Sequence, residues 1–391
     1  MNPPAAPTLG QVASLALQHP ELRLAPGQGK ILRALAACRT SALGGHRYRC
    51  AQCGRDHFVP HSCRNRHCPQ CQGAQALDWL ARQESALLPI PYFHLVFTLP
   101  HALNPMIGQN RRALLNLLFD AVNQTLLEFG RQQLKAQIGI TAVLHTWGQT
   151  LGDHYHLHCV VSGGGLALDG SGWISSSPYY LFPIKALSRM FCGKFCAGLQ
   201  RLERHGALEF HGQLTRLRQP QEFARLLREA REHKWVVYAK RPFAGPQQVL
   251  AYLSRYTHRV AISNGRLLAV DERQVTFRYK DYADGQRPKT MTLALEEFIR
   301  RFCLHLLPER FVKIRHYGLV SNRDRQARLA RARQCLGAAA PATESEPPPP
   351  IPVAEPAPAL RCPYCGAVAL VWMEELPPHR SSRVVAIADS S

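Results

Sequence analysis

Apolar and polar residues alternate with different periods along the chain, and the changes of period outline its elements. Residues 12–17 and 31–37 carry apolar side chains at helical spacing, which predicts two short N-terminal helices. Residues 46–73 contain few large aliphatic side chains and many Cys and His, so we expect a bound metal rather than an apolar core to hold them together. Residues 74–88 again have the period of a helix.

A strand-rich region follows. Residues 92–99 lie between two prolines and predict a strand. Residues 138–149 and 155–162 predict two further strands, and the turn-forming residues 151–153 between them predict an antiparallel hairpin. We expect the three glycines at 163–165 to end the second strand.

The rest of the chain continues this mixture. Helices are predicted over residues 110–136, 184–204, 220–233, 246–256, 295–307 and 322–334, and strands over residues 235–239, 267–270, 275–279 and 290–293. We therefore predict an α+β fold, in which an antiparallel sheet with flanking helices follows a small zinc-binding domain. Eight prolines without any period then predict an extended linker over residues 337–361.

Charge narrows the class of partner. Lys and Arg number 48 against 27 Asp and Glu, which gives a formal net charge of +21 and a pI near 9.8. A chain this basic is typical of nucleic-acid binders, although a basic protein without such a partner is the alternative. No apolar run reaches the roughly 18 residues of a membrane span, and residues 1–7 show no secretion signal. We expect no membrane partner and a location in the bacterial cytoplasm, at the nucleoid.

The cysteines indicate structural zinc. Cys50 and Cys53 form one CxxC pair and Cys68 and Cys71 a second, with 14 residues between the pairs. Two such pairs at this separation are typical of a tetrahedral Zn²⁺ site, and we predict that these four cysteines share one ion. Three neighbouring residues could instead replace one of the cysteines or bind a second metal: His61, Cys63 and His67.

Two features near these pairs have more than one interpretation. Arg64 and Arg66 make the segment basic, so we expect it to contact DNA phosphate or a base edge; a purely structural role is the alternative. Cys362 and Cys365 form a third CxxC pair, for which the sequence offers no obvious second pair, although His379 could contribute.

The sequence His154-Tyr-His-Leu-His158 suggests a second kind of metal site. Alternate residues of a strand face the same side, so His154, His156 and His158 share one face of the predicted hairpin. His156 and His158 can bind one metal together, and Gln149 on the preceding strand can supply an oxygen ligand suited to Mg²⁺ or Mn²⁺. Asp153 and His154 compete for this third position, and a zinc hydrolase site is the alternative interpretation.

A predicted helix carries two tyrosines on one face. Tyr252 and Tyr256 are four residues apart, and Arg255 and Arg259 form a parallel pair beside them. Such tyrosines are usually packing residues, but close to a metal a phenolate can attack a DNA phosphate and form a 5′-phosphotyrosine. The ester stores the energy of the broken bond, in agreement with the absence of a nucleotide-binding GxxxxGK[ST] loop.

These motifs together resemble a known family. HYHLHCVV, the earlier HTWGQ, VYAKRPFAGPQQVLAYLSRYTHRVAISN, SCRNRHCPQC and VKIRHYGLVSNR are similar to segments of the HUH two-tyrosine rolling-circle transposases of the insertion-sequence ninety-one group. The resemblance implies an N-terminal zinc-binding domain and an HUH-endonuclease-like catalytic domain. It implies that His156 and His158 bind the metal and that Tyr252 and Tyr256 are the nucleophiles.

The resemblance also implies the reaction and its partners. The chain would nick and rejoin single-stranded DNA at insertion-sequence ends and in target DNA. The excess of basic residues over 310–333 separately predicts contacts to the DNA backbone, including Arg315 and Arg323; a solvated helix face is the alternative. A replication initiator or relaxase, and a zinc-finger regulator with an inactive domain, are the competing hypotheses.

We predict domains at 1–85 and 86–335, a linker at 336–361 and a tail at 362–391; association as a homo-oligomer stays open.

Overall fold

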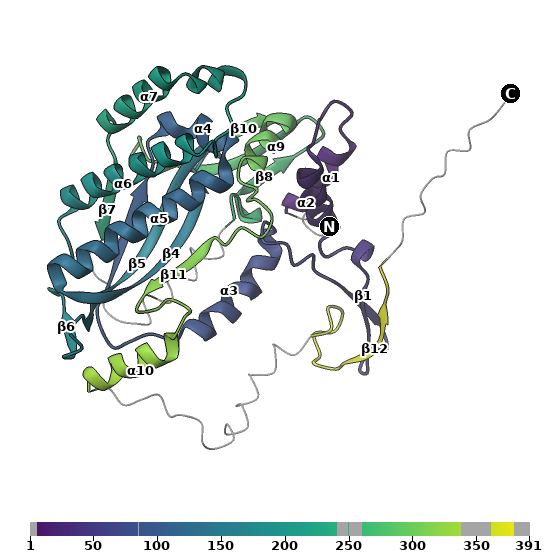
Figure 1. Ribbon diagram of the computed structural model, residues 1–391. Helices are drawn as coiled ribbons and strands as arrows, with labels where there is room; N and C mark the ends of the chain where they lie inside the picture. The colour runs from purple at the N-terminus through teal and green to yellow at the C-terminus, as the bar shows by residue number, and fades with distance from the viewer. Residues whose placement is uncertain (1–5, 85, 241–248, 250–259, 338–360, 379–391) are drawn as a thin grey trace.

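A six-stranded antiparallel sheet forms the centre of the protein (Figure 1). The computed structural model describes residues 6–84, 86–240, 249, 260–337 and 361–378. The sheet has the order β11-β4-β5-β3-β7, with β6 paired to β5. Its strands are β3 (Tyr92–Thr98), β4 (Ala136–Trp147), β5 (Asp153–Ala167), β6 (Trp173–Ser175), β7 (Val236–Lys240) and β11 (Ile314–Gly318). The predicted antiparallel sheet with flanking helices is confirmed.

Helices cover one face of this sheet. Figure 1 shows α5 (Arg111–Phe129) and α6 (Ile184–Arg204) lying across it, with α7 (Pro220–Glu232) farther out. Tyr155 and Leu157 of β5 are fully buried beneath them in the largest apolar core. The residues between and beside them on β5 therefore face the opposite side of the sheet, as the alternation of a strand requires.

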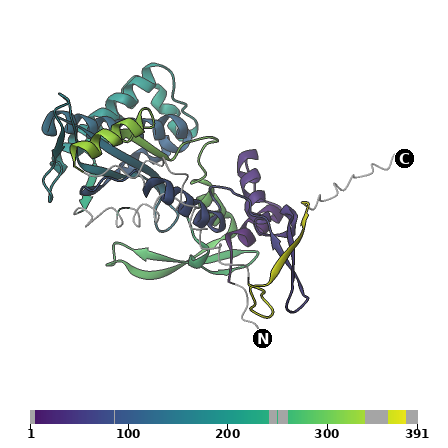
Figure 2. The ribbon, with the colours of Figure 1, turned by 90° about the horizontal axis from the view of Figure 1, so that it is seen from below.

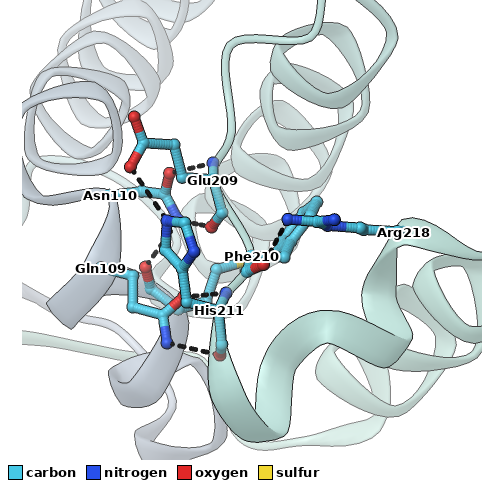
Figure 3. A network of polar contacts seen from close by, with 7 residues as sticks. Gln109, Asn110, Glu209, Phe210, His211 and Arg218 are labelled. Carbon is cyan, nitrogen blue, oxygen red and sulfur yellow. Dashed lines mark hydrogen bonds and ion pairs between the residues drawn. The ribbon is translucent and has the colours of Figure 1, made fainter.

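A pair of side-chain amides attaches a loop to the start of α5. Figure 3 shows Gln109, the last residue of α4 (Asn104–Gln109), and Asn110 against the loop that follows α6. Asn110 donates to the carbonyl of Glu209 at 2.9 Å and accepts from its amide at 2.7 Å. Gln109 makes the same two bonds with the backbone of His211, both at 3.0 Å. The two amides thus act on this loop as a neighbouring strand would.

The glycine run in β5 does not end the strand. The prediction that residues 163–165 terminate it is wrong, because β5 continues to Ala167. A Cβ on Gly165 would lie 2.4 Å from the carbonyl oxygen of Gln137 on β4. Gly164 has a φ of +141° and equally little space beside Ile174 of β6. The glycines are therefore positions of close backbone approach inside the sheet.

A second sheet packs against the N-terminal helices. It consists of β8 (Leu267–Val270), β9 (Gln274–Asp281) and β10 (Arg287–Ala294), in the order β10-β9-β8. Its apolar side meets α9 (Leu295–Cys303), α1 (Leu9–Gln18) and α2 (Pro26–Ala37) in one core. The two predicted N-terminal helices and the three predicted short strands are confirmed. The start of the chain is thereby fixed to residues about 260 positions away, as the bond from the Leu9 amide to Asn264 Oδ1 at 3.0 Å illustrates.

A third sheet joins the two ends of the described chain. It has the order β12-β1-β2, with β1 (Gly45–Cys50), β2 (Asp56–Pro60) and β12 (Leu370–Leu376). Figures 1 and 2 both show β12 beside β1. Two further α-helices are α3 (Pro69–Glu84) and α10 (Arg325–Cys335). Among the described residues, no helix has the length and apolar character that crossing a membrane requires.

Candidate active site and cysteine clusters

Three histidines converge on the face of the central sheet opposite α5 and α6. His145 of β4 lies directly across from His156 of β5 in the antiparallel register, and His158 is two residues farther along β5. One ring nitrogen of each lies within 4.8 Å of those of the other two. The rings of His156 and His158 are 4.9 Å apart between centroids, and that of His145 lies 5.4 and 4.6 Å from them. Three imidazoles so placed can bind one metal ion.

Hydrogen bonds orient two of these rings. Nδ1 of His156 lies 2.8 Å from the carbonyl oxygen of His154, to which it can donate a proton. Nδ1 of His158 lies 3.0 Å from Nε2 of His94 on β3. Both bonds engage Nδ1 of the ring. Ligand histidines in proteins are usually fixed by such a bond on the second nitrogen.

Burial favours the neutral form of two imidazoles in this region, His156 and His94. Burial, with smaller contributions from the neighbouring His158 and His154, holds the pKa of His156 well below its ordinary value. Burial also lowers the pKa of His94 to about 3. A neutral ring keeps the lone pair that a metal needs, so the lowered pKa suits His156 to bind an ion at neutral pH.

The structure places His145, and not the predicted Gln149, opposite His156 on the neighbouring strand. The turn between β4 and β5 runs from Gly148 to Gly152, and the amide of Gly148 donates to the carbonyl of Gly152 at 2.9 Å. Residue 145 is therefore the one that lies opposite His156. Gln149 lies in this turn, and its side-chain oxygen accepts from the amide of Lys280 at 3.4 Å. The prediction that Gln149 lies across from the histidines is wrong, because it placed the turn too late. The sequence did contain a signal, because His145 and His156 are equidistant from a turn centred on residues 150 and 151.

A cavity of about 510 Å³ opens at the three histidines. Its volume lies within the roughly 300–1,000 Å³ of typical ligand sites. Other lining residues come from the start of α3, the β4–β5 turn, residues 260–266 and the tip of the second sheet: Pro69, Gln72, Gly73, Ala76, Trp147, Gly148, Gln149, His154, Val260, Ala261, Ser263, Arg266 and Tyr282. The N-terminal region and the second sheet therefore both help to form the wall around the histidines.

The predicted tyrosines and their arginines lie outside the described residues. This applies to Tyr252, Arg255, Tyr256 and Arg259. The described residues on either side are placed, however: Val249 is fully buried in a small core, and Val260 lines the histidine cavity.

The cysteines form two clusters rather than the one predicted. Cys68 and Cys71 lie with Cys38 and Cys63, whereas Cys50 and Cys53 lie with Cys362 and Cys365. The prediction that Cys50, Cys53, Cys68 and Cys71 share one ion is therefore wrong in its grouping. The reason is β2, which runs antiparallel to β1 between the two pairs and carries the chain away from the first.

The first cluster has the geometry of a tetrahedral metal site. Sγ of Cys38 lies 3.5 Å from that of Cys68 and 3.6 Å from that of Cys71, and Sγ of Cys63 lies 3.7 Å from that of Cys71. Zn–S bonds of 2.3 Å in a tetrahedron separate the sulfurs by about 3.8 Å. Of the alternatives left open by the sequence, Cys63 belongs to this cluster, whereas the nearby histidines do not. The fourth member, Cys38, stands outside any CxxC pair.

Comparisons with known proteins identify the family. A family model described as "Transposase zinc-binding domain" matches residues 11–99, and another, described as "Putative transposase", matches residues 139–328. "Putative transposase y4qJ" of Sinorhizobium fredii is 47% identical over 327 residues, which span 83% of this chain and 82% of that protein. The chain belongs to this transposase family.

Two further similarities are weaker. The "Transposase for insertion sequence element IS801" of Pseudomonas savastanoi pv. phaseolicola is 29% identical over 293 residues, 74% of this chain and 69% of that one. Together with the zinc-binding model, it confirms the resemblance to the insertion-sequence ninety-one group. A solved structure of the conjugative relaxase TrwC with oriT DNA matches 42% of this chain and 71% of its own with 14% identity, but the TM-score is only 0.23.

The candidate sites of the transposase lie in different parts of the two matched ranges. The three histidines lie within the range of the second family model, and the first cysteine cluster lies wholly within the zinc-binding range. The second cysteine cluster lies only half within it, because Cys362 and Cys365 are far beyond residue 99.

The predicted DNA-contacting arginines have different surroundings. Both terminal nitrogens of Arg66 donate to backbone carbonyls of residues 308 and 311, and Arg315 donates to Asn116 Oδ1 while lying 4.1 Å above the ring of Phe119. The transposase thus uses these two guanidinium groups internally. Arg64 and Arg323 are exposed, and the side chain of Arg323 keeps 94% of its surface in solvent. Arg266, which no sequence motif singled out, also lines the histidine cavity.

Proposed function

We propose that this transposase nicks and rejoins single-stranded DNA at insertion-sequence ends, through a divalent metal at His145, His156 and His158 and a nucleophile from Tyr252 or Tyr256. The observation that carries the proposal is the three-histidine cluster, which lines a cavity together with Val260, the residue that follows the tyrosine segment. The rolling-circle-like route follows from the family resemblance. A protein acting on bacterial DNA would work in the cytoplasm.

Both ends of the tyrosine segment are fixed near the histidines. Val249 packs in the same small core as Val160, which is two residues along β5 from His158. Val260 lines the cavity itself. Ten residues connect these two positions, and they span about 15 Å as a helix and no more than about 36 Å when extended. This short connection supports the assignment of the nucleophile to this segment.

The donor set suits a divalent ion with room for a phosphate. Three imidazole nitrogens converge, and hydrogen bonds at Nδ1 hold the rings of His156 and His158. Mg²⁺ prefers oxygen ligands, so an all-nitrogen set favours Mn²⁺ over Mg²⁺, in contrast to the set containing Gln149. When bound, the ion would withdraw charge from the oxygens of the scissile phosphate and stabilise the charge that develops during cleavage.

The chain's own groups would perform the transfer. The phenolate of one tyrosine forms a bond to phosphorus, and the bond from phosphorus to the 3′-oxygen breaks. The 3′-oxygen takes up a proton and leaves as a hydroxyl, while the 5′-phosphate stays on the tyrosine. Attack by another 3′-hydroxyl reverses the exchange and releases the tyrosine. One phosphodiester replaces another, so rejoining needs no nucleotide cofactor.

The zinc-binding region would hold the DNA-binding part in place. We propose that Cys38, Cys63, Cys68 and Cys71 bind a structural Zn²⁺ at the start of α3, whose next residues line the cavity. The exposed Arg64 and Arg323 would contact the DNA backbone directly, together with Arg255 and Arg259. Arg66 and Arg315 would contribute by holding loops and strands in position.

The test is covalent capture of labelled single strands. Oligonucleotides carrying element ends are incubated with the full chain and Mn²⁺, Mg²⁺ or Zn²⁺, and adducts are separated on denaturing gels. We expect an adduct with Mn²⁺ that disappears in His156→Ala and in the double variant Tyr252→Phe/Tyr256→Phe. Tyr282→Phe is the matched control, because among the described residues Tyr282 is the tyrosine that lines the cavity. An adduct that survives in the double variant but disappears in the control would refute the assignment.

A further inference from the structure

Two short turns in this chain have the same sequence pattern although they are more than 300 residues apart. Cys50-Ala-Gln-Cys53-Gly54 and Cys362-Pro-Tyr-Cys365-Gly366 both read CxxCG. The pair formed by Cys68 and Cys71 lacks this glycine, since Gln72 follows it. The glycine therefore distinguishes the first and third pairs from the second.

The two turns also have the same backbone structure. In the first, the Cys50 amide donates to Arg55 and the Gly54 amide donates to Cys50, both at 2.9 Å. In the second, the Cys362 amide donates to Ala367 at 2.8 Å and the Gly366 amide to Cys362 at 2.9 Å. Both glycines adopt positive φ values, +70° and +75°, which a residue with a Cβ rarely takes. The turns are thus two copies of one thiolate-presenting knuckle.

The knuckles face each other with their sulfurs at the spacing of a metal site. Sγ of Cys50 lies 3.6 Å from that of Cys365, and Sγ of Cys53 lies 3.7 Å from that of Cys362. All four sulfurs lie within 4.8 Å of one another. Tetrahedral Zn–S bonds of 2.3 Å separate sulfurs by about 3.8 Å. No disulfide joins any of the four.

The surrounding strands hold the knuckles together. β12 pairs with β1 over its whole length, from Gly45 opposite Leu376 to Cys50 opposite Leu370. The Arg47 guanidinium lies 2.7 Å from the Glu374 carboxylate across this pair. Arg55 lies 5.0 Å above the ring of Tyr364, so one knuckle also contacts the other through side chains.

We infer that Cys50, Cys53, Cys362 and Cys365 bind a second Zn²⁺ through four thiolates, and that this ion fastens the C-terminal segment to the N-terminal region. The zinc-binding family model ends at residue 99 and contains only half of these ligands. The ion would therefore connect two parts of the chain that are separated in sequence by the whole central sheet and by the proline-rich residues 338–360. The small β12-β1-β2 sheet has no apolar core of its own among the described residues, so the metal replaces one.

Zinc content tests the site directly. Metal is measured by mass spectrometry on the purified full chain and on three double variants. Cys362→Ser/Cys365→Ser should lose one zinc per chain, and Cys63→Ser/Cys71→Ser should lose a different one. Cys192→Ser/Cys335→Ser, which removes cysteines outside both clusters, should lose none. Unchanged zinc in Cys362→Ser/Cys365→Ser would overturn the inference.

A cleavable linker provides a second readout, and its arm with unaltered cysteines does not depend on the folding of a variant. A protease site is placed within residues 338–360 of the otherwise unchanged chain, and the zinc-loaded protein is cut. The C-terminal fragment should co-elute with the rest of the protein in size-exclusion chromatography. The same cut in Cys362→Ser/Cys365→Ser should release it. Release from the unaltered cysteines, or retention without them, would each refute a zinc fastening.

Discussion

The third ligand of the histidine cluster gives the sharpest prediction. His145→Ala removes one of three converging nitrogens, whereas Gln149→Ala breaks a single 3.4 Å bond to the Lys280 amide. Removing a residue that only hydrogen-bonds to a metal ligand lowers metal affinity about 10- to 100-fold. Removing the ligand His145 should lower Mn²⁺ affinity by a larger factor, which corresponds to a loss of more than about 1.4–2.7 kcal/mol of binding free energy. The Gln149 variant should leave metal affinity unchanged and lower stability by no more than about 1.5 kcal/mol.

The assay is calorimetric titration of Mn²⁺ into the zinc-loaded protein, with adduct yield measured in parallel. His154→Ala is the matched control, because His154 lines the same cavity but lies outside the cluster. Its backbone carbonyl, which accepts from His156, remains in the variant. High Mn²⁺ should partly restore adduct formation in His145→Ala if the defect is one of affinity. Wild-type affinity in His145→Ala together with a loss in Gln149→Ala would refute the assignment.

Three further outcomes are expected. His94→Ala removes the partner of His158 Nδ1 and should lower Mn²⁺ affinity about 10- to 100-fold without unfolding the protein, measured by the same titration. Arg64→Ala should weaken DNA binding and lower the slope of log affinity against log salt concentration by about one, measured by fluorescence anisotropy. Arg315→Ala should instead lower the melting temperature, measured by calorimetry. Glu297, whose pKa falls to about 2 beside Arg300 and Arg301, should lose its stabilising effect as pH drops from about 4.5 to 2; Glu297→Gln should flatten stability in that window.

Local periodicity gave much of the architecture correctly. The alternation in residues 155–162 predicted that His156 and His158 share a face, and the structure places both on the side opposite the helical core. This worked because one face of the strand is buried, so a shift by one residue would expose Tyr155 and Leu157. The helical spacing of the long α5 and α6 was equally informative.

The identity of partners across the hairpin depended on the turn. Placing the turn at residues 151–153 led to Gln149, whereas the five-residue turn from Gly148 to Gly152 brings His145 opposite His156. A difference of a few residues in the turn changes every cross-strand pair, although it leaves each strand intact. Similarly, the sequence predicted Arg66 and Arg315 as DNA contacts, because it does not show that distant segments of the chain provide their hydrogen-bond acceptors.

The sequence by itself determined the elements and the chemical groups: the strands and helices, the basic charge, the CxxC pairs and the histidine strand. These properties depend on neighbours within one turn or one strand. Only the tertiary structure decided which groups meet. Cys68 joins Cys38, Cys50 joins Cys365, and His145 joins His158, because strand pairing and packed cores bring together segments up to 315 residues apart. A metal site requires that convergence in space, and spacing along the chain does not specify it when several cysteine pairs are present.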